Sequence, residues 1–165
     1  MSGHAGRQMT SDSLVIRAAA GTERLRLEAL QWRAALMLDE YRAALLAHPD
    51  AVELPVEHIT QGRTLVAERN SVLAGFAVVL PRDDGDADLD GLFVEPAMWR
   101  QGIGTQLTRA AESLAASRGA KYLHVVAHPG ALAFYAACGF APVGETQTRF
   151  AIGLAMSKPI RSASA

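Results

Sequence analysis

The spacing of hydrophobic and polar positions changes several times along this chain, and each change predicts a new secondary-structure element. Residues 14–18 form a short β-prone run, which predicts a first strand. Apolar residues then recur every three or four positions over residues 27–45, the spacing of one buried helical face, and Thr22 is the expected N-cap of this long helix. Pro49 predicts its end.

Strand and helix spacing continue to alternate through the rest of the chain. Further strands are expected at residues 64–68, 72–80, 88–94 and 122–127, with two more between residues 142 and 156, and further helices at residues 55–62, 103–119 and 131–138. The strand–helix–strand unit over residues 88–127 predicts one parallel pair, because a helical crossover joins its strands. The rest of the sheet should be largely antiparallel. The predicted fold class is therefore α/β, with a mixed and mostly antiparallel sheet flanked by helices.

Composition fits one globular domain. The chain has 165 residues, half of them hydrophobic and a fifth charged, and its formal net charge of -1 gives no electrostatic reason to bind nucleic acid. No apolar run approaches the roughly 18 residues that cross a bilayer, and residues 1–13 lack the apolar core of a signal peptide. We expect residues 1–13 to be a disordered tail, residues 14–158 to form the domain, and the protein to be cytoplasmic without membrane partners. The single cysteine, Cys138, excludes an internal disulfide.

Two glycines lie where the predicted strand at residues 88–94 leads into the next helix. Gly102 and Gly104 fall at the first helical turn, where unpaired backbone N–H groups favour an anion such as a phosphate or pyrophosphate. A dinucleotide-binding fingerprint would need a third glycine where the chain has Leu107, and no Gly-Lys-Ser/Thr follows for a Walker A loop. The alternative is that the glycines only let the helix pack closely on the strand.

Two pairs of segments together resemble the signatures of a known family. Residues 92–96 and 100–105, Leu-Phe-Val-Glu-Pro and Arg-Gln-Gly-Ile-Gly-Thr, resemble the acetyl-CoA-binding signature of the GNAT N-acetyltransferases. Residues 131–135 and 138–140, Ala-Leu-Ala-Phe-Tyr and Cys-Gly-Phe, resemble the family's second signature, a helix that carries Phe-Tyr and ends in Gly-Phe. The resemblance covers about residues 14–156 and is strongest over residues 88–144.

The resemblance implies a co-substrate and a place for it. In the family, the strand before the glycine turn splays away from the next parallel strand, and acetyl-CoA fills the opening. In this chain the strand backbone would pair with the pantetheine arm, the glycine turn would hold the pyrophosphate, and no metal is implied. The implied cofactor-binding residues are Leu92, Phe93, Val94, Arg100, Gln101, Gly102, Gly104, Thr105, His128, Ala131 and Phe134. A backbone N–H near Val94 would polarise the thioester carbonyl.

Two positions depart from the family pattern. Trp99 stands where the family usually has Gln or Arg, and Arg100, which follows it, would supply that charge. His128 stands where the second signature usually begins with Asn, and an imidazole replaces one hydrogen bond of an amide but not both. The expected pyrophosphate site therefore rests on backbone N–H groups from Gln101 to Thr105 more than on side chains.

Acetyl transfer to an amine needs groups that move protons. By position, Tyr135 matches the tyrosine that protonates or hydrogen-bonds the departing CoA thiolate in many family members; the alternative is a half-buried core tyrosine. Asp90 is the candidate base, because Asp88 and Asp90 share one face of their strand and Asp90 lies nearer the expected splay. The alternatives are that both aspartates are simply solvated, that Glu57 or Glu68 is the base, or that a water chain replaces it.

The remaining histidines and the cysteine do not indicate a metal site or a nucleophile. His124 and His128, four apart on a strand, would lie roughly 13 Å from each other, too far to share one metal ion. Cys138 fits a small buried hydrophobic residue.

The family resemblance implies an acetyl-CoA-dependent N-acetyltransferase that acts on a primary amine of a small molecule or peptide by direct attack in a ternary complex. A non-catalytic acyl-CoA-binding sensor is the alternative, and homodimerisation through the terminal strands, common in the family, stays open.

Overall fold

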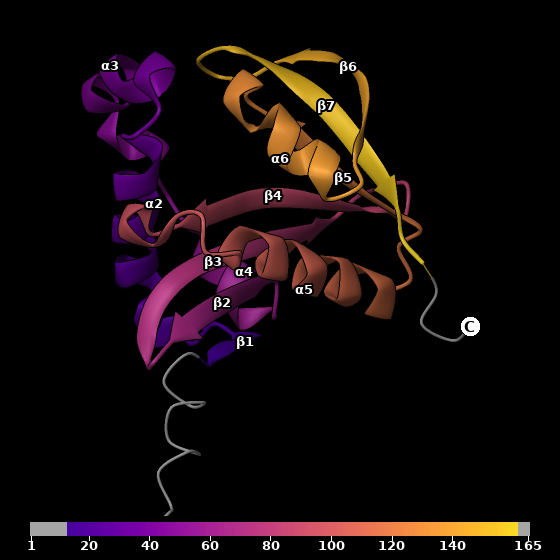
Figure 1. The fold of residues 1–165 in the computed structure, drawn as a ribbon, viewed down its shortest axis with the longest axis horizontal. Helices are drawn as coiled ribbons and strands as arrows, with labels where there is room; N and C mark the ends of the chain where they lie inside the picture. Colours follow the sequence, from indigo (N-terminus) through magenta and orange to yellow (C-terminus); the bar gives the residue numbers. More distant parts are fainter. Residues whose placement is uncertain (1–12, 162–165) are drawn as a thin grey trace, which may run out of the picture.

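The structure, a computed structural model, describes residues 13–161 and shows one seven-stranded sheet flanked by helices (Figure 1). The strands are β1 (Leu14–Ala18), β2 (Thr64–Arg69), β3 (Val72–Pro81), β4 (Ala87–Val94), β5 (Tyr122–Ala127), β6 (Ala141–Gln147) and β7 (Ile152–Pro159). Their order in the sheet is β1-β2-β3-β4-β5-β7-β6, and every neighbouring pair is antiparallel except β4 and β5. The predicted mixed, mostly antiparallel sheet is confirmed, and the expected disordered tail lies, but for residue 13, outside the described residues.

Five α-helices and four 3-10 turns connect the strands in the described part of the chain. The α-helices are α2 (Arg24–Ala35), α3 (Asp39–Ala47), α4 (Val56–Thr60), α5 (Ile103–Ser117) and α6 (Leu132–Ala137), and the 3-10 turns are η1 (Gly21–Glu23), η2 (Pro49–Ala51), η3 (Pro96–Met98) and η4 (Pro129–Ala131). The helices expected at residues 55–62, 103–119 and 131–138 correspond to α4, α5 and α6. None of these helices is long and apolar enough to cross a membrane.

The helices bury apolar side chains on both faces of the central strands. On one face α5 packs against β2, β3 and β4 (Figure 1). Leu107 of this helix is fully buried. On the other face Leu27 and Leu30 of α2 and Ile59 of α4 belong to one buried cluster with Phe76 of β3. Because both faces are covered, residues 74–79 of β3 are all buried and do not alternate between core and solvent.

The parallel strands β4 and β5 are paired over a short stretch. The register joins Ala87 to Leu123 and Asp88 to His124, and within the described part of the chain it records no further pair. The register between β3 and β4 slips at the next residues, so that Asp90 is the extra residue of a β-bulge. A bulge bends its strand, and beyond this one β4 and β5 diverge, as the family resemblance implied.

The prediction of one long helix over residues 27–45 is wrong, because the chain forms α2 and α3 with a turn between them. The N–H groups of Met37 and Leu38 bind carbonyls three residues back at 3.2 and 3.1 Å, which tightens the end of α2. The Arg42 guanidinium donates to the Leu36 carbonyl at 3.1 Å and satisfies an acceptor that the helix end leaves open. The apolar spacing continues through this turn, so periodicity alone could not reveal it.

The start of α2 also differs from the prediction, in which Thr22 is the N-cap. Thr22 lies inside η1, and the carboxylate of Glu23 accepts the N–H of Ala20 at 2.8 Å. Glu23 is buried and also accepts two hydrogen bonds from Arg17, at 3.0 and 2.6 Å. Arg17 in turn binds Glu68 of β2 at 2.9 Å. Contacts between distant segments therefore fix the entry into α2, and local spacing carries no signal for them.

Candidate functional site

A cavity of about 650 Å³ opens where β4 and β5 diverge, and we call it the β4–β5 cavity. It is lined by β4, the turn before α5, the end of β5, the start of α6 and the end of α2. The predicted site residues that line it are Asp90, Leu92, Phe93, Val94, Arg100, Gly102, Gly104, Thr105, His128, Ala131, Phe134 and Tyr135. Gln101 is the one predicted site residue outside this lining. The two signatures thus meet at one cavity, whose volume is in the range of small-molecule sites.

The turn before α5 has the backbone conformation of an anion-binding turn. Gly102 is the N-cap of α5 and is left-handed, with φ 81. Arg100 is also left-handed, with φ 67, which is uncommon for a residue with a side chain. The N–H of Gln106 donates to the Gly102 carbonyl at 3.1 Å and begins the helical ladder. The N–H groups before it are those that a helix leaves unpaired, and they lie at the positive end of the helix dipole.

The two glycines of this turn are favoured for different reasons. A Cβ on Gly102 would meet nothing within 4 Å, so glycine is favoured there by its positive φ. A Cβ on Gly104 would lie 3.2 Å from the ring of Phe134 in α6, closer than ordinary van der Waals contact. Gly104 therefore lets the two signature segments pack together. The packing interpretation of the glycines applies to Gly104 and not to Gly102.

The edge of β4 that faces the cavity carries backbone groups without a strand partner. Glu95 donates its N–H to Ala74 of β3 at 2.8 Å. Antiparallel residues alternate between bonded and non-bonded pairs, so Phe93 directs its N–H and C=O to β3, whereas Leu92 and Val94 direct theirs toward β5. Since β5 has diverged there, Leu92 and Val94 have the backbone groups that a pantetheine arm would pair with.

Trp99, which departs from the family pattern, has a structural role at this edge. Its indole Nε1 donates to the Val94 carbonyl at 2.8 Å. This bond satisfies one backbone acceptor at the end of β4 and holds the chain after η3 against the strand. The N–H of Val94 stays directed toward the cavity, so the group expected to polarise a thioester carbonyl is retained.

A cation that the sequence analysis did not single out lies beside the glycine turn. Arg69, at the end of β2, donates from Nη1 to Oε1 of Gln101 at 2.7 Å. Its Nε is buried and has no hydrogen-bond partner among the described residues. The two residues are 32 positions apart, and the sheet brings them together. An anion bound at the turn would gain this nearby positive charge.

His128 provides one of the hydrogen bonds expected from an asparagine at its position. Its Nδ1 accepts the N–H of Gly130 at 3.1 Å and so caps η4. Its ring also meets Tyr41 of α3 edge-on, with ring centroids 6.1 Å apart. The imidazole therefore links the end of β5 to α3, a second role that an amide side chain could not fill in this way.

Tyr135 lines the cavity and is buried among aromatic rings. The ring centroids of Phe134 and Phe140 lie 5.0 and 5.5 Å from its own, in edge-to-face arrangements. Burial raises the pKa of the Tyr135 phenol well above its usual value. The phenol therefore stays protonated at neutral pH and can donate a hydrogen bond into the cavity.

Asp90, the bulged residue of β4, lines the cavity with its side chain exposed to the open space. The surrounding protein raises the pKa of this carboxyl by desolvation, His58 of α4 partly lowers it, and Asp88 raises it further. A raised carboxyl pKa lies closer to neutral pH and suits a general base better. The effect of Asp88 on the pKa of Asp90 is consistent with the two side chains lying on one face of β4.

The other residues considered for chemistry lie outside the cavity lining. Glu68 is paired with Arg17 at 2.9 Å, and neither Glu68 nor Glu57 lines the cavity. Cys138 is half-buried, and burial raises the pKa of its thiol. A raised thiol pKa fits a packed residue and not a nucleophile.

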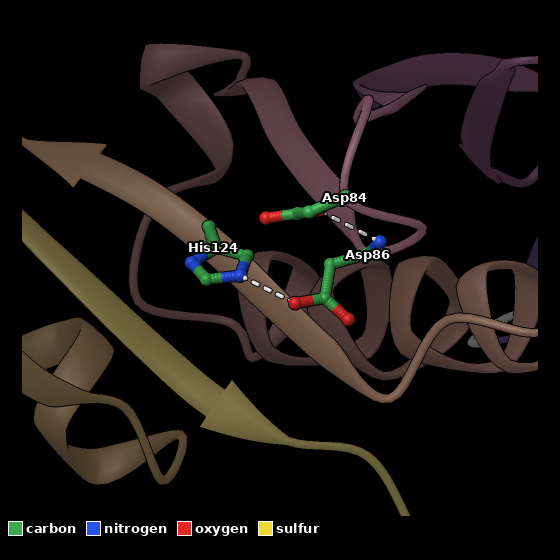
Figure 2. A group of neighbouring side chains, drawn as sticks. All are labelled: Asp84, Asp86 and His124. Atoms are coloured by element: carbon green, nitrogen blue, oxygen red, sulfur yellow. Dashed lines mark hydrogen bonds and ion pairs between the residues drawn. The ribbon is translucent and has the colours of Figure 1, made fainter.

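His124 belongs to a hydrogen-bonded cluster with two aspartates (Figure 2). Its Nε2 lies 3.1 Å from Oδ2 of Asp86, and the other oxygen of Asp86 accepts the N–H groups of Lys121 and Tyr122 at 3.3 and 3.1 Å. Asp84 accepts the N–H of Asp86 at 2.9 Å. The potential metal-ligating atoms of Asp84, Asp86 and His124 lie within 4.8 Å of one another, a grouping not expected from the sequence. Each of these side chains already has a protein partner, so the cluster fastens the β3–β4 turn to β5.

Comparisons with known proteins agree with this geometry. A model of the acetyltransferase (GNAT) family matches residues 28–140 of the chain. No curated protein matches it significantly. Among solved structures, the PaiA N-acetyltransferase from Thermoplasma acidophilum in complex with coenzyme A is 20% identical with TM-score 0.72, covering 89% of this chain and 99% of that one.

Two further structures have the same fold. A GCN5-related N-acetyltransferase from Rhodopseudomonas palustris is 21% identical with TM-score 0.72, covering 90% of this chain and 97% of its own. The ribosomal-protein-S18-alanine N-acetyltransferase from Escherichia coli is 20% identical with TM-score 0.68, covering 92% of this chain and 96% of its own. The family model spans most of the chain and includes both segments that line the β4–β5 cavity. The chain therefore belongs to the GNAT acetyltransferase family.

Proposed function

We propose that this protein is an acetyl-CoA-dependent N-acetyltransferase that acetylates a primary amine of a small molecule or peptide. Enzymes of this family take acetyl-CoA as co-substrate and need no metal. The observation that carries the proposal is the β4–β5 cavity, because it is lined by both signature segments and by both candidate catalytic residues. The acceptor attacks directly, in a ternary complex with acetyl-CoA.

In this proposal the co-substrate takes the place of the missing strand pairing. The pyrophosphate binds at the Gly102 turn, where the backbone N–H groups before Gln106 and the guanidinium of Arg69 supply positive charge. The pantetheine arm pairs with the backbone of Leu92 and Val94. This arrangement extends β4 toward β5 and sets the thioester near Tyr135, which lines the same cavity.

The chemical step moves one acetyl group and one proton. The neutral amine attacks the thioester carbonyl carbon, and the N–H of Val94 donates to the oxygen that becomes an oxyanion. The C–S bond then breaks and CoA leaves as a thiolate, to which the Tyr135 phenol donates a hydrogen bond while keeping its proton. The amine proton passes to Asp90 directly or through water, and from there through solvent to the thiolate. The products are an amide and CoA.

Two measurements test the proposal. Titration calorimetry of the full chain with acetyl-CoA should show binding with a Kd below about 1 mM. A Kd of that size corresponds to a binding free energy of roughly -4 kcal/mol. Release of free thiol from acetyl-CoA should then depend on added amine. The sensor alternative needs the glycine turn but neither Tyr135 nor Asp90, so amine-dependent thiol release excludes it, whereas tight binding without thiol release from any amine favours it.

A further inference from the structure

A second cavity adjoins the β4–β5 cavity on the sheet face opposite α5. It has a volume of about 430 Å³ and shares Val125 and Val126 with the first. On β5 the side chains of Leu123, Val125 and Ala127 are buried in the cluster beneath α5 and α6, so the alternate residues project to the other face. We call this second cavity the β5–β7 groove. The two shared residues place the groove next to the cavity in which the thioester is proposed to lie.

The floor of the β5–β7 groove is apolar and uncovered. Val126 of β5 is paired in register with Ala155 of β7, which places both side chains next to each other on one face. Val126 is 52% exposed and Val143 of β6, which lines the same groove, is 69% exposed. Single exposed apolar residues are ordinary, but adjacent ones around a cavity are typical of a binding surface.

The charged groups that line the groove are already paired, whereas Asp90, which lines the adjoining β4–β5 cavity, is not. Arg82 binds Asp88 at 2.9 Å and Asp84 at 3.2 Å, and His124 is held by Asp86 at 3.1 Å. Asp90 takes part in no ion pair among residues 13–161, although it lies two residues beyond Asp88 toward the opening. Together the two cavities offer a ligand the Asp90 carboxylate, which has no ion-pair partner among the described residues, and the apolar surface of the neighbouring groove.

We propose that the β5–β7 groove holds the body of the acceptor, and that the acceptor is a primary amine on an uncharged apolar group, such as an alkyl or arylalkyl chain. This inference rests on the proposed function. The amine lies at Asp90, next to the thioester, and its chain lies on Val126 and Ala155. A carboxylate on the acceptor would find the Arg82 guanidinium already neutralised, and a second ammonium would lie on apolar surface, so amino acids and polyamines are disfavoured.

A series of amines with the wild-type protein tests this assignment. In straight-chain amines from ethylamine to hexylamine the reacting group stays the same while the buried apolar area grows. We expect kcat/KM, measured by thiol release from acetyl-CoA, to rise by about two- to fourfold for each methylene until the groove is filled. Phenethylamine should be a good acceptor, and spermidine and lysine should be poor ones.

One substitution should remove this dependence on chain length. Ala155→Trp fills the groove, so hexylamine should lose its kcat/KM advantage over ethylamine, while acetyl-CoA affinity, measured by calorimetry, stays at the wild-type value. Val143→Asp, at a more exposed position, should give the same loss if the tryptophan variant does not fold. Val72→Trp, on the exposed start of β3, is the matched control and should keep the wild-type series.

The outcomes separate this inference from the proposed function. A flat series, or faster turnover of spermidine or lysine, overturns the groove assignment and leaves the acetyltransferase proposal standing. An unchanged series in Ala155→Trp and Val143→Asp also overturns the assignment. Failure to bind acetyl-CoA, or absence of thiol release with every amine, overturns the proposed function and this inference with it.

Discussion

The surroundings of the Tyr135 phenol decide what this residue can contribute. Its ring is enclosed by Phe134 and Phe140, where a phenolate would lose its hydration. Burial therefore raises the pKa of Tyr135, so the neutral donor persists through and above the physiological pH range. A phenol of this kind can donate a hydrogen bond to a thiolate and is a poor general base. This separates the role proposed for Tyr135 from the role proposed for Asp90.

Tyr135→Phe keeps the packed ring and removes only the donor. We expect kcat for acetyl transfer to fall by about 100-fold, while the affinity for CoA, measured by calorimetry, stays close to that of the wild type. Ser117→Ala, which removes one exposed hydroxyl at the end of α5, is the control and should retain wild-type kcat. A parallel loss of CoA affinity in Tyr135→Phe would contradict the assigned role and point to a packing function.

Glu23 makes stability depend on pH. Hydrogen bonds from Arg17 oppose desolvation and lower the pKa of the Glu23 carboxyl from 4.5 to about 2. Because this folded-state value lies below that of the unfolded chain, the contribution to stability is complete above pH 4.5 and is lost as the pH falls toward 2. We expect this group to account for a decrease of about 2 to 3 kcal/mol in the free energy of unfolding across that window.

Glu23→Gln tests this dependence. The variant should be less stable than the wild type at pH 7, and its free energy of unfolding, measured in urea, should change less between pH 4.5 and 2. Glu53→Gln, at an exposed position, should keep the wild-type slope. A wild-type slope in Glu23→Gln would mean that other carboxylates govern acid unfolding.

Among the elements, the turn into α5 depends on backbone conformation at one position. Gly102 has φ 81 and open space where a Cβ would lie, so Gly102→Ala changes the conformational energy without a clash. The left-handed conformation costs an alanine about 1 to 2 kcal/mol, and we expect a loss of thermal stability with a several-fold weaker Kd for CoA. Gly144→Ala, which also has open space but no positive φ, is the control. Unchanged CoA binding in Gly102→Ala would show that the pyrophosphate site does not depend on this turn.

The turn between α2 and α3 shows where local patterns stop being informative. The apolar spacing over residues 27–45 is unbroken, yet the chain leaves the helical path after Ala35. One reason lies outside the segment, since Tyr41 of α3 packs edge-on against His128 at the end of β5. A tertiary contact therefore decides the direction of α3, and a spacing rule can locate the apolar face but not this change of direction.

For the whole molecule, α3 connects the N-terminal half to the β6–β7 hairpin. The ring of His48 stacks on Phe150 with centroids 5.8 Å apart, and Arg149 lies over Phe150 at 5.0 Å. Arg149 also reaches Asp50 of η2 at 3.5 Å. With the contact between Tyr41 and His128, these interactions hold the α3 segment across the diverging ends of the sheet.

Phe150→Ala should loosen this connection. We expect faster hydrogen exchange in α3 and η2, because stacking on His48 and Arg149 is lost, with no change in α5. Ile152→Ala, an exposed apolar residue at the start of β7, is the control and should exchange like the wild type. Unchanged exchange in α3 would show that the contact between Tyr41 and His128 is sufficient by itself.

The strands, most helices and the residues gathered at the cavity could be predicted, because each follows from local spacing or from a contiguous signature. The signature segments around Gly102 and Tyr135 meet because a strand–helix–strand unit returns the chain to the same edge of the sheet. The pairs Arg17 with Glu68 and Arg69 with Gln101 could not be predicted, since they join residues 51 and 32 positions apart. The bulge at Asp90 is also a property of two paired strands and has no signal within one.

The short pairing between β4 and β5 has a consequence for the protein's resistance to proteolysis and aggregation. Within the described chain, two register pairs are the backbone pairing between the β1–β4 half of the sheet and the β5–β7–β6 half, so β4 and β5 each present an interior edge beyond them. If the co-substrate pairs with the β4 backbone there, as proposed, each catalytic cycle forms and breaks hydrogen bonds in the middle of the sheet. Resistance to proteolysis and aggregation would then follow the supply of CoA by mass action, and the abundance of the protein would report on that supply.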